Sequence, residues 1–125
     1  MMAPTVAVDG RGVVLAAGSA GGSRLRSALV QVVAGILDEG LDPRTAVERP
    51  RLHPAGRLVH LEAGFGAATE RALAGRGFEV RRWAGRHHYF GGASVVARSG
   101  VAADPRRDGL ALDLRGRPSA SQSSR

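Results

Sequence analysis

Two adjacent glycines, Gly21 and Gly22, stand where an apolar segment ends and an amphipathic segment begins. Glycine lets the backbone turn sharply and lets a ligand approach closely, because no Cβ is in the way. The first amides of a helix have no partner within the helix, and the helix N-terminus carries partial positive charge. Such a turn suits a phosphate, a carboxylate or the oxyanion of an acyl-transfer intermediate. A tight turn without a ligand is the alternative that a double glycine alone leaves open.

The element before this turn is predicted to be the second strand of a hairpin. Pro4–Val8 and Val13–Ala17 have strand composition, and Asp9-Gly10 between them is a strong hairpin signal. The second strand is apolar at every position, which predicts burial on both faces. Further strands are predicted at Leu58–Glu62, Phe78–Trp83, Ala93–Arg98 and Val101–Ala103.

Three helices are predicted along the chain. The longest covers residues 23–39, with Ser23 as N-cap, Gly40 as stop and one apolar stripe at helical spacing. A short helix follows, with Asp42 as N-cap and Pro43 at its first position. The third covers Ala67–Ala74. Mixed hairpins and helices of this kind predict an α/β (α+β) fold.

Composition limits the class of protein. The chain has 125 residues, of which 43% are hydrophobic, so we expect one domain or part of one. It has no cysteine, which excludes disulfides and thiolate metal sites. We expect residues 1–114 to form the folded part and the polar residues 115–125 to be a disordered tail. No signal peptide or transmembrane segment is predicted, so the chain as encoded would be cytoplasmic unless an upstream segment directs export.

The net charge of +7 raises the question of a nucleic-acid partner. All 18 basic residues are arginine and lysine is absent, as strongly GC-rich coding would produce. The arginines are also spread along the chain with few aromatic residues between them, whereas nucleic-acid binders concentrate charge on one face. We therefore expect no nucleic-acid partner, and a small basic nucleic-acid-binding protein is kept only as the second alternative.

Three other groups of residues have side chains that could form a site. The four histidines, at positions 53, 60, 87 and 88, lack ligand spacing, and adjacent His87 and His88 side chains should diverge on a helix or a strand. Asp104–Gly109 is interpreted as a turn in which an Asp side chain caps backbone amides beside local Asp/Arg pairs. Tyr89–Gly92 is interpreted as a packed loop that leads into a strand, with the lining of a pocket as the alternative.

Four blocks together carry a resemblance to a known family. They are Met2–Thr5, Gly18–Arg24, Ala46–His53 and Ala102–Gly109. In this order and spacing they resemble the C-terminal part of the small subunit of gamma-glutamyltransferases, which belong to the N-terminal-nucleophile hydrolase superfamily. The resemblance extends from Met2 to about Leu112.

The resemblance implies a fold, an activity and site residues. The fold would be part of a four-layer αββα sandwich, with residues 1–114 as the C-terminal portion of a small-subunit domain. The activity would be transfer or hydrolysis of gamma-glutamyl groups from substrates such as glutathione, without metal or organic cofactor. The backbone amides of Gly21 and Gly22 would form the oxyanion hole. Ala20 departs from the pattern, because the family commonly has proline there, and this departure would loosen the loop.

The family's nucleophile, a threonine that begins the small subunit after self-cleavage, has no match in this sequence. Thr5 falls where the family has a strand threonine, and Thr45 and Thr69 fall in predicted helices. We therefore expect a fragment that begins downstream of the catalytic threonine, inactive alone and requiring an upstream large-subunit and nucleophile-bearing polypeptide. A non-catalytic structural remnant or subunit that needs such a partner is the first alternative.

Overall fold

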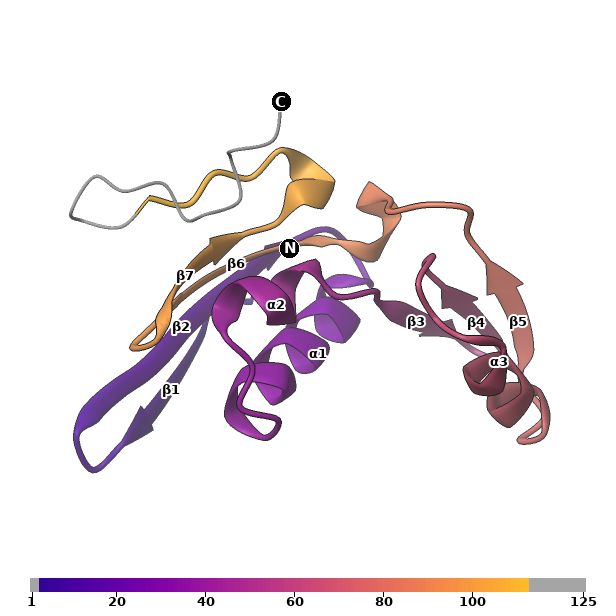
Figure 1. Ribbon diagram of the computed structural model, residues 1–125, viewed down its shortest axis with the longest axis horizontal. Coiled ribbons are helices and arrows are strands. Elements are labelled where there is room, and N and C mark those ends of the chain that lie inside the picture. Colours follow the sequence, from indigo (N-terminus) through magenta and orange to yellow (C-terminus); the bar gives the residue numbers. More distant parts are fainter. Residues whose placement is uncertain (1–2, 113–125) are drawn as a thin grey trace.

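The computed structural model describes residues 3–112 of the chain (Figure 1). The molecule is elongated, with a four-stranded sheet and helices α1 and α2 at one end and a three-stranded sheet with α3 at the other (Figure 1). The elements in chain order are β1 (Thr5–Asp9), β2 (Gly12–Ala20), α1 (Leu25–Leu37), α2 (Pro43–Glu48), β3 (Leu52–Ala55), β4 (Leu58–Leu61), α3 (Ala67–Ala74), β5 (Glu79–Arg82), η1 (His88–Phe90), β6 (Gly92–Ala97), β7 (Gly100–Ala103) and η2 (Pro105–Arg107).

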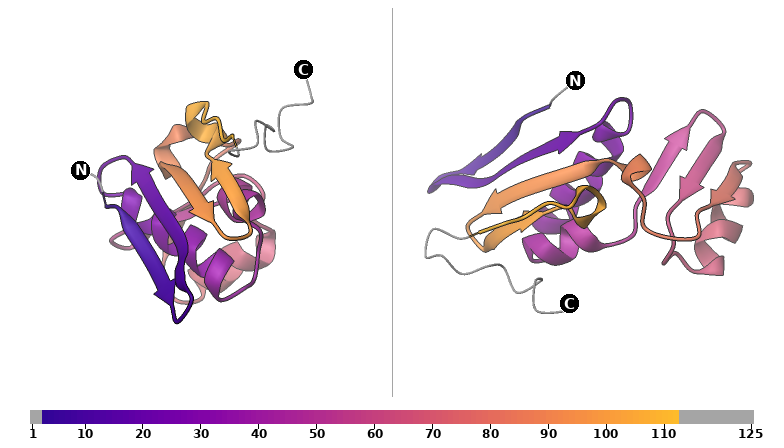
Figure 2. Two further views of the ribbon diagram at one scale, coloured as in Figure 1. Left: turned by 90° about the vertical axis from the view of Figure 1, so that its left-hand side faces the viewer. Right: turned by 90° about the horizontal axis from the view of Figure 1, so that it is seen from above.

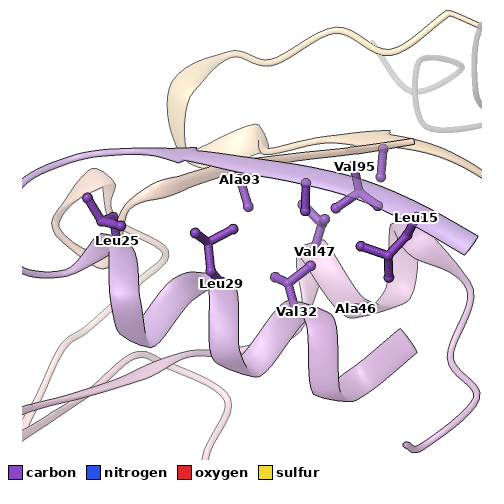
Figure 3. Close-up of a cluster of buried hydrophobic side chains, with 10 residues drawn as sticks. Leu15, Leu25, Leu29, Val32, Ala46, Val47, Ala93 and Val95 are labelled. Atoms are coloured by element: carbon purple, nitrogen blue, oxygen red, sulfur yellow. The ribbon is translucent and has the colours of Figure 1, made fainter. Parts of the chain in front are cut away.

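The larger sheet has the strand order β1-β2-β6-β7, with every neighbouring pair antiparallel. Both α1 and α2 cover the same face of it, and α2 packs against β6 and β7 (Figure 2). The core lies between the helices and this face, because the inward side chains of the strands meet the apolar stripe of α1 (Figure 3). Its buried members are Leu15, Ala17, Leu25, Leu29, Val32, Ala46, Val47, Ala93, Val95 and Ala102.

Of the two faces of β2 that the sequence predicts to be buried, one is open in the described chain. Leu15 is fully buried against the helices, whereas Val13 is 56% exposed. On the same open face, Val6 of β1 and Val96 of β6 flank Ala16 and are 60% and 62% exposed. The sequence pattern reflects two apolar faces, but only one of them is covered within residues 3–112.

The hairpin and the start of α1 each differ from prediction by a few residues. Asp9 pairs with Gly12, so the turn is formed by Gly10 and Arg11, and the Asp9 carboxylate accepts from the Arg11 amide at 2.7 Å. Ser23 is not the N-cap of α1, because the chain first makes a turn and the helix begins only at Leu25.

The other helix ends lie close to their predicted positions. α1 ends at Leu37 instead of residue 39, and Gly40, with φ of 69°, lies just beyond its C-cap Asp38. The Leu41 amide donates back to Gly35 O at 2.9 Å. Asp42 caps α2, since its side chain accepts from the amides of Arg44 and Thr45. The third helix has the predicted bounds.

The smaller sheet has the order β3-β4-β5, and α3 packs against β5. β4 and β5 are parallel and occupy the predicted segments to within a residue or two, whereas β3 was not predicted. β3 contains Pro54, which a strand tolerates here because β3 is an edge strand.

The predicted α/β fold is confirmed. The predicted tail of residues 115–125 lies outside the described residues, and none of the described helices has the length and apolarity needed to cross a bilayer.

Candidate active site

Gly21 and Gly22 lie between the end of β2 and the start of α1. Gly21 has φ of 138°, a conformation that side-chain-bearing residues rarely adopt, so glycine is required there. The Leu25 amide donates to Gly22 O at 3.3 Å and closes the turn. Within residues 3–112, the amides of Gly21 and Gly22 donate no hydrogen bond. Ala20 is held by pairing with Gly92 in the sheet, which fixes the position where the family commonly has proline.

A hollow of about 180 Å³ opens beside this turn. The residues that line it come from the glycine turn, the first turn before α1, the loop before β6 and η2. They are Gly21, Gly22, Arg24, His87, His88, Tyr89, Gly91 and Arg107. The structure thus places the two predicted site residues at an open concavity that is rich in positive charge.

The loop before β6 packs closely against the glycine turn. A Cβ at Gly21 would lie 3.9 Å from Gly91 Cα, and a Cβ at Gly91 would lie 3.3 Å from both Ser19 Oγ and Ala28 Cβ. Gly91 itself has φ of 82°. The wall opposite the glycine turn is therefore backbone, held near its present position by α1 and β2.

A network of buried charges lies behind this wall. Asp104, which is 2% exposed, pairs with Arg51 at 2.6 Å and with Arg106 at 3.1 Å. Its carboxylate also accepts from the amides of Ala93 at 2.8 Å and Arg106 at 3.0 Å. The predicted capping turn at Asp104 is confirmed. The Asp104 side chain also binds β6 and Arg51, far beyond the local pairs that the sequence indicated.

Glu62 is the second buried carboxylate of this network. It pairs with Arg106, whose Nε donates to Glu62 Oε1 at 2.8 Å, and it accepts from the amides of Arg51 and His87 at 3.0 Å each. Arg106 also donates to Val47 O at 2.9 Å. These contacts connect α2, the end of β4, the loop before β6 and η2, so they join the two ends of the molecule.

The two buried arginines differ in how well their charge is compensated. Burial lowers the pKa of Arg51, and the Asp104 charge only partly opposes this effect. Burial acts in the same direction on Arg106, but the hydrogen bonds and charges of Glu62 and Asp104 outweigh it and raise the pKa of Arg106. The sequence composition did not indicate that Arg51 and Arg106 form buried ion pairs, because the abundance of arginine is explained by GC-rich coding.

An aromatic cluster forms the other side of the hollow. Tyr89 stacks on Trp83 with ring centroids 4.7 Å apart, and it lies 4.7 Å from the ring of His60. Trp83 Nε1 donates to His60 Nδ1 at 3.1 Å. Arg24 places its guanidinium over Tyr89, 4.3 Å from the ring centroid. Tyr89 and Gly91 of the loop interpreted as packing line the candidate site, which was the alternative for this loop.

The histidines do not act as a group of ligands in the described residues, among which no cluster of three or more His, Asp or Glu could hold a metal ion. His53 Nδ1 lies 2.8 Å from Ser27 Oγ. The prediction that His87 and His88 diverge is wrong, since their ring centroids are 4.2 Å apart. The reason is local: His87 is extended and caps the 3₁₀ turn that contains His88, so the pair lies on neither a helix nor a strand.

The threonines lie away from the glycine turn's hollow. Thr5 is on β1, and its hydroxyl donates to Ala3 O at 3.2 Å. Thr45 is in α2, and its hydroxyl donates to the Asp42 carboxylate at 2.6 Å. Thr69 is in α3, at the other end of the molecule. Among the described residues, no threonine lines the hollow.

Comparison with known proteins identifies the family. The sequence model of the gamma-glutamyltranspeptidase family matches residues 1–114. The chain belongs to this family. The resemblance carried by the four sequence blocks is confirmed.

Two curated relatives and one solved structure match parts of the chain. Glutathione hydrolase proenzyme of Escherichia coli is 33% identical over 81 residues, covering 63% of this chain and 14% of that protein. Acylase ACY 1 proenzyme of a Pseudomonas species is 31% identical over 81 residues, covering 65% and 14%. A crystal structure of a Helicobacter pylori gamma-glutamyltranspeptidase variant superposes with a TM-score of 0.72 at 25% identity, covering 84% of this chain and 60% of that one. The chain thus matches a small part of the curated relatives.

Proposed function

We propose that this chain takes part in the transfer or hydrolysis of gamma-glutamyl groups from glutathione-like substrates, with the amides of Gly21 and Gly22 as its oxyanion hole. The observation that supports this proposal most directly is that, within the described residues, both amides lack a hydrogen-bond partner and both glycines line an open hollow in the turn before α1. Family membership and the glutathione hydrolase relative support the choice of reaction.

The chemistry requires a nucleophile opposite these amides. A threonine hydroxyl attacks the γ-carbonyl carbon, its proton passes to the free α-amino group of that threonine, and the carbonyl oxygen becomes an oxyanion. The C–N bond then breaks, the departing amine takes the proton, and a γ-glutamyl ester remains. Water or an acceptor amine attacks the ester and restores the hydroxyl. One amide donor in such a hole typically contributes about 3 kcal/mol of transition-state stabilisation.

We propose that the nucleophile is supplied by an upstream polypeptide. The hydroxyls of Thr5 and Thr45 donate to groups away from the hollow, and Thr69 lies in the distant α3. The open apolar face of the larger sheet, with Val6 and Val96 exposed, offers the surface that the second sheet of a four-layer sandwich would cover. The isolated chain is therefore inactive, and apolar surface left open also lowers its stability.

The test is reconstitution. The chain is purified alone and together with an upstream polypeptide that begins with the family's threonine, and release of the chromophore from a γ-glutamyl anilide is measured with a thermal melt of each sample. We expect turnover only in the complex, together with a higher melting temperature. Turnover by the chain alone, lost in Thr5→Ala, would overturn the assignment of the nucleophile. A stable complex without turnover would favour the alternative of a non-catalytic structural subunit.

A further inference from the structure

The hollow beside Gly21 and Gly22 carries more positive charge than an oxyanion hole requires. Arg24 and Arg107 both line it, and its described lining includes no carboxylate. Neither arginine has an ion-pair partner within residues 3–112. Two backbone amides suffice for one oxyanion, so these two charges have no role in the function proposed above.

Arg24 is held in place without being neutralised. Its guanidinium lies 4.3 Å from the centroid of the Tyr89 ring, a cation–π contact. Tyr89 is in turn fixed by stacking on Trp83, at 4.7 Å between centroids, and its amide donates to His87 Nδ1 at 3.0 Å. A ring face attracts the cation but accepts few of its five N–H groups. The remaining donors are available to an anion in the hollow.

The position of Arg107 is restricted by its contact with Gly92 and by its neighbour Arg106. A Cβ at Gly92 would lie 2.9 Å from Cγ of Arg107, so the arginine stem lies directly against the Gly92 backbone. The neighbouring Arg106 is anchored by Glu62 and Asp104. The backbone that carries Arg107 is thus tied to the buried network, while the side chain reaches the hollow.

We infer that Arg24 and Arg107 bind a carboxylate on the amine side of the substrate, that is, on the departing amino acid or peptide and on an acceptor of the same kind. This inference rests on the proposed function, which places the scissile carbonyl oxygen at Gly21 and Gly22. The amine is bonded to that carbonyl carbon, so its substituents lie in the adjoining space. A hollow of about 180 Å³ accommodates a small residue with its carboxylate. The guanidinium group of arginine matches a carboxylate with two parallel N–H donors, so it is a preferred partner of carboxylates in proteins.

The kinetic test uses two donors in the reconstituted complex, γ-glutamyl-4-nitroanilide and its 3-carboxy derivative, which differ only in one carboxylate on the leaving group. Arg24→Gln and Arg107→Gln should each raise KM for the carboxylated donor about tenfold more than KM for the plain anilide, the size of one solvent-screened charge-assisted contact. Arg26→Gln is the matched control, because Arg26 lies in α1, two residues after Arg24, and does not line the hollow. Equal losses on both donors overturn the inference. A weaker affinity of the Arg24→Gln or Arg107→Gln variant for free glutamate overturns it as well, because the arginines would then bind the carboxylate of the γ-glutamyl group.

A binding test separates this inference from the proposed function. Glycylglycine and glycylglycinamide are titrated into the chain and followed by the NMR signals of Gly21 and Gly22. We expect tighter binding of glycylglycine, with the preference lost in Arg24→Gln and retained in Arg26→Gln. If the complex turns over neither anilide, the proposed function fails and this titration still decides the inference. Equal binding of the two peptides would overturn it.

Discussion

Asp104→Ala should destabilise the fold far more than an exposed substitution of the same kind. The Asp104 carboxylate is 2% exposed and pairs with the guanidinium groups of Arg51 and Arg106. It also accepts from the amides of Ala93 and Arg106. Its removal leaves Arg51, 1% exposed, without its ion-pair partner, and breaking a buried pair in this way costs about 3–5 kcal/mol.

The matched control is Asp9→Ala. Asp9 pairs with Arg98 at 2.8 Å, a geometry similar to that of the buried pair, but its side chain is 40% exposed. Water and salt screen this pair, so its loss should lower the free energy of unfolding several times less. Asp104→Asn tests the charge alone, since an amide keeps one acceptor oxygen. We expect a destabilisation between those of the two alanine variants.

The assay is urea unfolding followed by the fluorescence of Trp83, the single tryptophan of the chain. With a slope of about 2 kcal/mol per molar urea, a loss of about 4 kcal/mol moves the midpoint by about 2 M. Sucrose in every sample keeps marginal variants folded. The reasoning would be refuted if Asp104→Ala shifted the midpoint no more than Asp9→Ala.

Two further predictions concern stability. Asp42→Ala should cost about 1 kcal/mol, because the side chain caps α2 through the amides of Arg44 and Thr45; a urea midpoint equal to wild type would contradict the capping role. Burial, followed by nearby arginine charges, lowers the pKa of His53 and His60. Above the unfolded pKa of about 6.5 both histidines are neutral in the folded and unfolded states, and the free energy of unfolding has its full value. As pH falls from there toward the lowered folded pKa values, the unfolded state binds protons first, so the free energy of unfolding decreases. Urea midpoints measured between pH 7.5 and 5 should fall with pH, and the double variant His53→Gln/His60→Gln should show a flatter profile in that window.

The sequence predicted those parts of the fold that local chemistry determines. The stripe of α1 and the Asp42 cap each depend on a few neighbouring residues, and the structure has both, while α1 ends at Leu37, a few residues before the predicted stop at Gly40. The start of α1 at Leu25 was missed because Ser23 has the right residue type for a cap but lies within a turn. The strand β3 was missed because Pro54 is compatible with a strand only at a sheet edge, and the sequence does not show which strand is the edge.

The candidate site was only partly predictable for the same reason. Gly21 and Gly22 stood out because the turn and the helix start are adjacent in sequence. The roles of Arg51 and Arg106 did not, since their shared partner Asp104 lies 53 positions from Arg51 and burial cannot be inferred from composition. Arg107 reaches the hollow because that network fixes the backbone beside it, which again depends on long-range contacts.

The most direct test of the account is a pair of substitutions at Gly22 in the reconstituted complex. The backbone of Gly22 lies outside the left-handed region, and a Cβ there would meet nothing within 4 Å, so Gly22→Ala should fold normally and retain its amide donor. Gly22→Pro removes that donor. With γ-glutamyl-4-nitroanilide, we predict that kcat falls by about 10²–10³ in Gly22→Pro and stays near wild type in Gly22→Ala, with equal melting temperatures. Wild-type turnover in Gly22→Pro, or an equal loss in both variants, would contradict the oxyanion-hole assignment.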